Sequence, residues 1–168
     1  MSLKLFFLTT EIEPFASTSH LGKFSVDVPL ALQTVEHDIR TIIPKYGFVS
    51  ERKYILREVI RLREIPFDFD GEEIITSAKS AFIPKTRVQV YFLENPDLFK
   101  DLTNLLYKSK NGRLLTDNDE RYGYFTNGYR TGDYIRLKFE QKYWDNLGAY
   151  NLFINDIGDK SKINDFDT

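Results

Sequence analysis

The chain has 168 residues, a formal net charge of -2 and 15% aromatic residues, which is typical of one soluble globular domain. The near-neutral charge gives no electrostatic basis for binding nucleic acid or an anionic membrane. The absence of cysteine excludes disulfides, thiolate metal sites and cysteine nucleophiles, and it favours a cytoplasmic location. We expect no membrane span, because no apolar run approaches the roughly 20 residues that a bilayer requires.

The first part of the chain predicts a βαβ unit. An apolar strand at 4–9 leads through a loop at 11–22 into a helix, and a second strand at 38–43 ends in a Pro-Lys-Tyr-Gly turn. Ser19 or Thr18 is the expected N-cap of the helix. Ligands of open α/β sheets bind at the carboxyl ends of parallel strands, and helix starts offer free N–H groups to anions. The loop is therefore the candidate binding site.

The helix of this unit has apolar residues at three- and four-residue spacings, which predicts a single apolar stripe. The stripe consists of Leu21, Phe24, Val28, Ala31, Leu32 and Val35. Pro29 lies within the pattern, and an interior proline costs about 3 kcal/mol and kinks a helix.

The middle of the chain predicts a β-hairpin, with strands near 58–69 and 74–82 joined by an Asp-Gly-Glu turn. A third core strand is expected at 88–93, followed by a short helical stretch at 97–108. Acidic residues after Thr116 suit the positive end of a helix dipole and predict a further helix.

The last part of the chain is less regular. We expect a helix near 134–144, a strand near 149–154 and a polar, frayed end from Gly158. The pattern as a whole predicts an α/β fold: a Rossmann-like, mainly parallel sheet flanked by helices, with an inserted β-hairpin. We divide the chain into an α/β domain at 1–130 and a carboxyl-terminal extension at 131–168.

Several landmarks along the first 130 residues resemble, in the same order, the amino-terminal domain of bacterial glycogen synthases and plant starch synthases. They are Glu11-Ile12-Glu13-Pro14-Phe15-Ala16 in the loop, Val28-Pro29-Leu30-Ala31-Leu32 in the helix, Pro44-Lys45-Tyr46-Gly47, Val90-Tyr91-Phe92-Leu93-Glu94-Asn95-Pro96, and Asp117-Asn118-Asp119-Glu120-Arg121-Tyr122. The segment from Ser50 to Leu62 looks most like short, divergent relatives of these synthases.

This resemblance implies the first domain of a two-domain, retaining glucosyltransferase, which transfers glucose from ADP-glucose to an α-1,4-glucan. In the family the loop reads Lys-Thr-Gly-Gly-Leu-Gly-Asp, and its lysine and glycine backbone hold the diphosphate and the sugar. The matching positions here run from Ser17 to Lys23, so the lysine, two glycines and the aspartate are replaced. By family position, the ligand-binding residues are expected to be Ser17, Thr18, Ser19, His20 and Gly22.

The resemblance does not extend to the family's His-x-His-Asp-Trp strand end, since His20 and His37 are the chain's two histidines. We therefore expect no catalytic residue, no metal and no cofactor, and a domain that is inactive alone. Possible partners are ADP-glucose, an α-glucan, or a separate chain that supplies the second domain. The alternatives are a non-catalytic module that binds glucan or sugar nucleotide, and a structural or interaction domain.

A glycosidase would require two suitably placed carboxylates. The acidic residues available for that role are Glu11, Glu13, Asp117, Asp119 and Glu120. The sequence does not give the separations between them, and it contains no serine-histidine-acid signature and no P-loop.

Overall fold

The computed structural model describes residues 2–69 and 71–130. Its sheet has six strands in the order β1-β2-β6-β5-β3, with β4 paired to β5 outside this path. The strands are β1 (Lys4–Leu8), β2 (Asp38–Pro44), β3 (Arg57–Glu58), β4 (Ile65–Phe69), β5 (Glu72–Phe82) and β6 (Gln89–Glu94). The helices are α1 (His20–Thr34), α2 (Glu51–Tyr54), the 3-10 helix η1 (Ile60–Leu62), α3 (Pro96–Phe99) and α4 (Asn118–Arg130).

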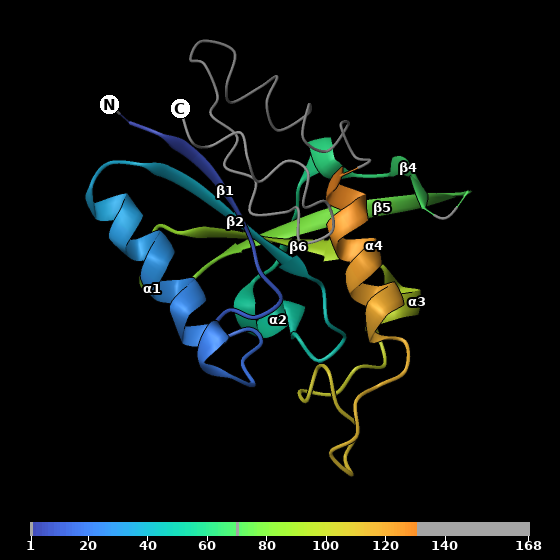
Figure 1. Ribbon diagram of the computed structural model, residues 1–168. Coiled ribbons are helices and arrows are strands. Elements are labelled where there is room, and N and C mark those ends of the chain that lie inside the picture. The colour runs from blue at the N-terminus through green and yellow to red at the C-terminus, as the bar shows by residue number, and fades with distance from the viewer. Residues whose placement is uncertain (1, 70, 131–168) are drawn as a thin grey trace, which may run out of the picture.

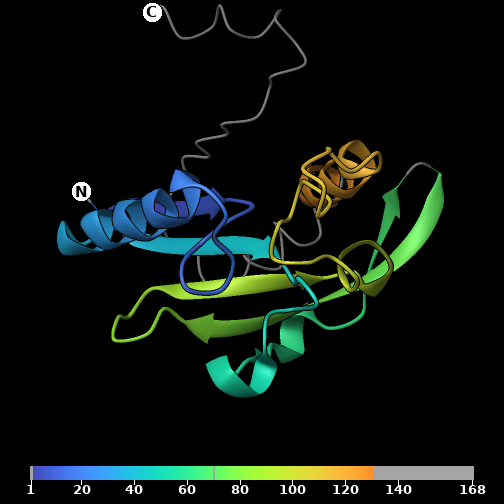
Figure 2. The same ribbon diagram turned by 90° about the horizontal axis from the view of Figure 1, so that it is seen from below.

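The sheet has a parallel and an antiparallel half. β1 pairs in parallel with β2, and β2 pairs in parallel with β6, which confirms the predicted βαβ opening and the α/β class. β5 runs antiparallel to β6, β3 and β4, so the predicted hairpin is present and extends the sheet. Helices α1 and α2 lie on the same side of the sheet (Figures 1 and 2).

The core lies where the two halves meet. β6 contributes four consecutive buried residues, Val90 to Leu93, as expected of a parallel strand covered on both faces. Aromatic rings dominate around it. Phe15 packs edge-on against Phe92, with ring centroids 5.0 Å apart, and Tyr46 does the same against Phe99 at 5.7 Å. The βαβ loop is thus anchored on the central strand.

Some elements are shorter than the sequence predicts. The helical stretch expected at 97–108 is the single turn α3, and Leu106 has a positive φ of 54° that no helix continues through. The strand expected at 58–69 is divided by η1 and by Glu64, whose φ is 51°. The elements expected at 134–144 and 149–154 lie outside the described residues, as does the polar end.

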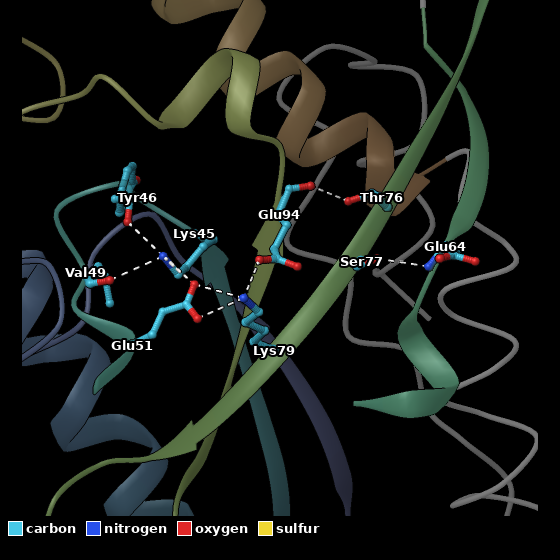
Figure 3. A network of polar contacts seen from close by, with 9 residues as sticks. All are labelled: Lys45, Tyr46, Val49, Glu51, Glu64, Thr76, Ser77, Lys79 and Glu94. Carbon is cyan, nitrogen blue, oxygen red and sulfur yellow. Dashed lines mark hydrogen bonds and ion pairs between the residues drawn. The ribbon is translucent and has the colours of Figure 1, made fainter. Parts of the chain in front are cut away.

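A network of ion pairs fastens α2 to the antiparallel half of the sheet. The Lys79 ammonium on β5 lies 2.9 Å from Glu51 on α2 and 3.2 Å from Glu94 on β6. Lys45, which directly follows β2, is 3.5 Å from the same Glu51 carboxylate. Figure 3 shows Lys79 between the two carboxylates. The network links elements from both halves, so we regard it as structural.

Within the described part of the chain, no helix is both long and apolar enough to cross a membrane.

Candidate functional site

The loop between β1 and α1 leaves the sheet at the carboxyl end of a parallel strand, as predicted. It folds back on itself, because the Ile12 N–H donates to the Ala16 carbonyl at 2.8 Å. Ile12, Phe15 and Ala16 are buried and anchor this turn in the core. The Glu13 N–H donates to the carbonyl of Gly22 at 3.1 Å, which ties the loop to the first turn of α1. Its backbone is therefore held in one position against the helix.

The loop is organised around the side chain of Glu11, its first residue. Its side chain is fully buried, and its carboxylate accepts hydrogen bonds from both the main chain and the side chains of two successive residues. The N–H groups of Thr18 and Ser19 donate to Oε2 at 2.6 and 2.9 Å. The hydroxyls of Thr18 and Ser19 donate to Oε1 at 2.9 and 3.1 Å. Glu11 therefore acts as an internal anion at the start of α1.

Burial and hydrogen bonding act on the Glu11 carboxyl in opposite directions. Burial is the largest single influence and raises its pKa, because a charge is disfavoured away from water. The hydrogen bonds from Thr18, Ser19 and Tyr107 stabilise the charged form and together outweigh burial, so the pKa is lowered from 4.5. Glu11 is thus ionised at neutral pH.

After these contacts, few main-chain N–H groups in the first turn of α1 are left to donate to a ligand. Ser19 is the N-cap, as predicted, and its hydroxyl accepts from the Leu21 N–H at 3.2 Å. The Gly22 N–H donates to the Ser19 carbonyl at 3.3 Å. Among the described residues, no hydrogen bond is made by the main-chain N–H of His20. The His20 N–H is therefore the donor at this helix start that remains for a ligand.

Gly22 is a close-approach position. A Cβ built on it would lie 2.3 Å from the Ser17 hydroxyl and 2.7 Å from the Ser17 Cβ, distances that real side chains do not adopt. Ser17 in turn donates to the Glu13 carboxylate at 3.3 Å. The glycine is thus required here because the loop packs directly on the helix.

Three tyrosines, of which Tyr46 is buried and Tyr107 and Tyr122 are half-buried, close the other side of the loop. The Tyr46 hydroxyl donates to the Thr10 carbonyl at 2.8 Å, and the Tyr107 hydroxyl lies 2.6 Å from the Thr10 hydroxyl. Tyr122 follows on α4, with its hydroxyl 3.5 Å from that of Tyr46. Burial raises the pKa of all three phenols. They stay neutral at physiological pH and supply hydrogen bonds rather than charge.

The structure brings together the residues that the sequence analysis selected, since Ser17, Thr18, Ser19, His20 and Gly22 all lie on this loop and helix start. Their role as ligand contacts stays a prediction. The sequence did not predict that Glu11 lies under the loop, or that its carboxylate contacts Tyr107. No local pattern in the sequence indicates a contact between residues that are almost a hundred positions apart.

The other acidic residues do not join Glu11 in a site. Asp117 forms an ion pair with Arg121 one turn further along α4, and Glu13 is exposed. Within the described residues, no group of three His, Asp or Glu side chains is placed to hold a metal ion.

The fold and the loop define a Rossmann-like α/β domain with a candidate ligand loop after its first strand. The same fold is found in the catalytic domain of starch synthase IV from Arabidopsis thaliana bound to ADP and acarbose. That structure has a TM-score of 0.60 and 19% sequence identity, over 84% of this chain and 26% of the Arabidopsis chain. At this identity the likeness shows the fold alone.

The sequence assigns the family. Residues 4–131 match the starch synthase catalytic domain. The glycogen synthase of Chlorobium limicola is 31% identical over 127 residues, which are 76% of this chain and 26% of the relative. That of Chlorobium luteolum is 31% identical over 125 residues, or 74% of this chain and 25% of the relative. The chain belongs to the glycogen and starch synthase family, and it spans about a quarter of the length of these relatives.

Proposed function

We propose that this chain is a synthase-family domain that does not, by itself, transfer glucose from ADP-glucose to an α-glucan. The observation that supports the proposal best is the loop itself, in which Ser17, Ser19 and His20 stand where the family has a lysine and two glycines. Retaining transfer requires preorganised donors and cations that stabilise the leaving diphosphate. Here the loop has no lysine at that position, and the side chains of Ser19 and His20 occupy the place where glycines let the backbone approach a ligand.

The direct test is incorporation of radiolabelled glucose from ADP-glucose into glycogen, with the Chlorobium limicola glycogen synthase as positive control. We expect the full chain to incorporate no label above a heat-treated sample. Incorporation that rises in proportion to the concentration of the chain contradicts the proposal.

The second candidate is a binding module that uses the same loop for ADP, phosphate or a glucan. The observation that favours it is the unused N–H of His20 beside an exposed imidazole at the start of α1. Lys23 is exposed one turn further along. We propose that any such ligand contacts Ser17, Thr18, Ser19, His20 and Gly22.

Titration with ADP, phosphate and maltooligosaccharides, followed by amide NMR, should move the signals of residues 18–23 first. His20→Ala should weaken the binding of ADP, whereas His37→Gln, which changes the other histidine, should not. Shifts confined to the hairpin at 65–82 rule out this module.

A further inference from the structure

The chain contains two Asn-Gly pairs, and the structure places them in different surroundings. Asn111-Gly112 lies in the connection between Tyr107 and α4, where both residues are exposed. Asn127-Gly128 lies within α4. An asparagine that precedes glycine is open to attack on its side-chain amide, because glycine lacks the Cβ that would shield its main-chain nitrogen. The two pairs are chemically alike, so conformation decides which of them reacts.

Asn111 lies in a tight, hairpin-like turn. The Gly112 N–H donates to the Ser109 carbonyl at 2.9 Å, and the Ser109 N–H donates to the Arg113 carbonyl at 2.9 Å. Gly112 has a φ of 79°, the left-handed conformation that closes a three-residue hairpin loop. The turn therefore holds the Asn111 side chain in one orientation at the surface, where water reaches it.

Two donors converge on the side-chain carbonyl of Asn111. The Ser109 hydroxyl donates to Oδ1, and the Arg113 N–H donates to the same oxygen at 3.2 Å. When a nucleophile adds to an amide carbon, negative charge develops on the amide oxygen, and donors that already point at this oxygen stabilise that charge. Ser109 and Arg113 therefore favour attack on the Cγ atom of Asn111.

Helix α4 gives Asn127 the opposite surroundings. In a helix, each main-chain N–H donates to the carbonyl four residues earlier, so the Gly128 nitrogen is part of the helical hydrogen bonding. Attack on the Asn127 side chain would require this part of the helix to unwind. The second pair is therefore protected by the fold and serves as an internal control.

We propose that Asn111 is a site of spontaneous deamidation, in which Ser109 and Arg113 stabilise the charge on Oδ1. The Gly112 nitrogen loses its proton to hydroxide and bonds to Cγ of Asn111. The Cγ–Nδ2 bond breaks and ammonia leaves, which closes a succinimide ring. Water then opens the ring at either carbonyl and gives aspartate or isoaspartate. The reaction consumes one water and converts a neutral amide into a carboxylate and an ammonium ion.

This modification would alter the surroundings of the candidate site. The turn follows Tyr107, whose carbonyl accepts from the Leu115 N–H at 2.9 Å and whose hydroxyl lies 2.6 Å from that of Thr10. Isoaspartate adds a methylene group to the main chain, which a three-residue turn cannot accommodate without moving. We expect the product to displace Tyr107 relative to Thr10. The reaction requires no ligand, so it stands or falls separately from the proposed function.

Incubation of the full chain at neutral pH in water labelled with heavy oxygen, followed by peptide mass spectrometry, tests the proposal. Cleavage after glutamate separates the two pairs into peptides 95–120 and 121–140. We expect label at position 111, as both aspartate and isoaspartate, and about 10-fold less or lower at position 127. In concentrated urea, where both conformations are lost, the two positions should react at similar rates. No label at position 111 of the folded chain, or equal rates at the two positions, overturns the proposal.

Variants of Ser109 test the role of the donor. Ser109→Ala removes the hydroxyl but keeps the main-chain bonds of the turn, and it should slow labelling at position 111 by roughly 3- to 10-fold, because water competes with an exposed donor. The matched control, Ser109→Thr, keeps a hydroxyl and should retain the wild-type rate. Circular dichroism confirms that both variants are folded. Labelling of Ser109→Ala at the wild-type rate overturns the role of Ser109.

Amide NMR of the incubated wild-type chain tests the effect on the candidate site. The signals of Tyr107 and Thr10 should divide into two sets, in the proportion of isoaspartate that mass spectrometry finds. A single, unshifted set in a deamidated sample would show that the modification does not reach the candidate site.

Discussion

Glu11 and Glu51 both lie among hydrogen-bond donors, but they differ in exposure and in the charge of their partners. The Glu11 side chain is fully buried, and its donors are neutral hydroxyls and main-chain N–H groups. The Glu51 side chain is 47% exposed and pairs with the ammonium groups of Lys45 and Lys79. Within residues 2–69 and 71–130, the Glu11 carboxylate thus has no cation paired to it, whereas the network on α2, β5 and β6 balances its charges.

This difference distinguishes the carboxylate of the candidate site, Glu11, from the carboxylate of a structural ion-pair network, Glu51. Exposed ion pairs can be lost with little effect on stability. A buried carboxylate that satisfies several donors cannot be removed without leaving those donors unpaired. We infer that Glu11 fixes the conformation of the loop, and that Glu51 only adjusts how firmly α2 is attached.

The largest expected effect is that of Glu11→Ala. It removes the acceptor of four hydrogen bonds, and we expect the free energy of unfolding to fall by about 2–3 kcal/mol. Urea denaturation monitored by circular dichroism measures this. Glu13→Ala, which changes an exposed carboxylate of the same loop, should cost less than about 0.5 kcal/mol. Equal losses for the two variants would show that Glu11 has no special role.

Gly22→Ala should have an intermediate effect. Its Cβ would overlap Ser17, so we expect a loss of about 1–2 kcal/mol from overpacking. The double variant Ser17→Gly/Gly22→Ala removes the clashing side chain and should recover part of that loss, which a double-mutant cycle in urea quantifies. An additive cycle would mean that the loop does not pack on α1 as described.

The smallest expected effect is that of Glu51→Ala. It removes ion pairs that are partly exposed, and we expect a loss of about 0.5 kcal/mol at low salt. The loss should shrink further in 1 M NaCl, where screening acts over roughly 3 Å. A loss that exceeds that of Glu11→Ala, or that salt does not reduce, would reverse the comparison between the two carboxylates.

The parallel half of the sheet could be predicted from the sequence, because apolar runs, a turn motif and helical spacing all indicate the same elements there. It also located the loop and the Ser19 cap. It was insufficient for the stretch at 97–108, where leucines at helical spacing cannot reveal the positive φ of Leu106. The apolar stripe on α1 was found, but periodicity does not say which side of a helix meets the sheet. The small residues Gly22, Ser25 and Pro29 face it instead.

The site could be predicted only in part, because some of its contacts are local in the chain and others are not. The loop residues follow one another in the chain, so their grouping is local. The environment of Glu11 depends on Tyr107, and such distant contacts depend on how the connection after β6 returns to the loop.

The most direct test of the account is the titration of Glu11 itself, followed by carbon NMR of its side-chain carboxyl. We expect a midpoint below 4.5, because the hydrogen bonds outweigh burial. A lowered pKa also means that the unfolded chain binds the proton more readily. The stability that Glu11 contributes is therefore present above about pH 4.5 and is lost as the pH falls through the folded-state pKa. A midpoint above 4.5 would contradict the account, because burial would then dominate and the loop would not hold an internal anion.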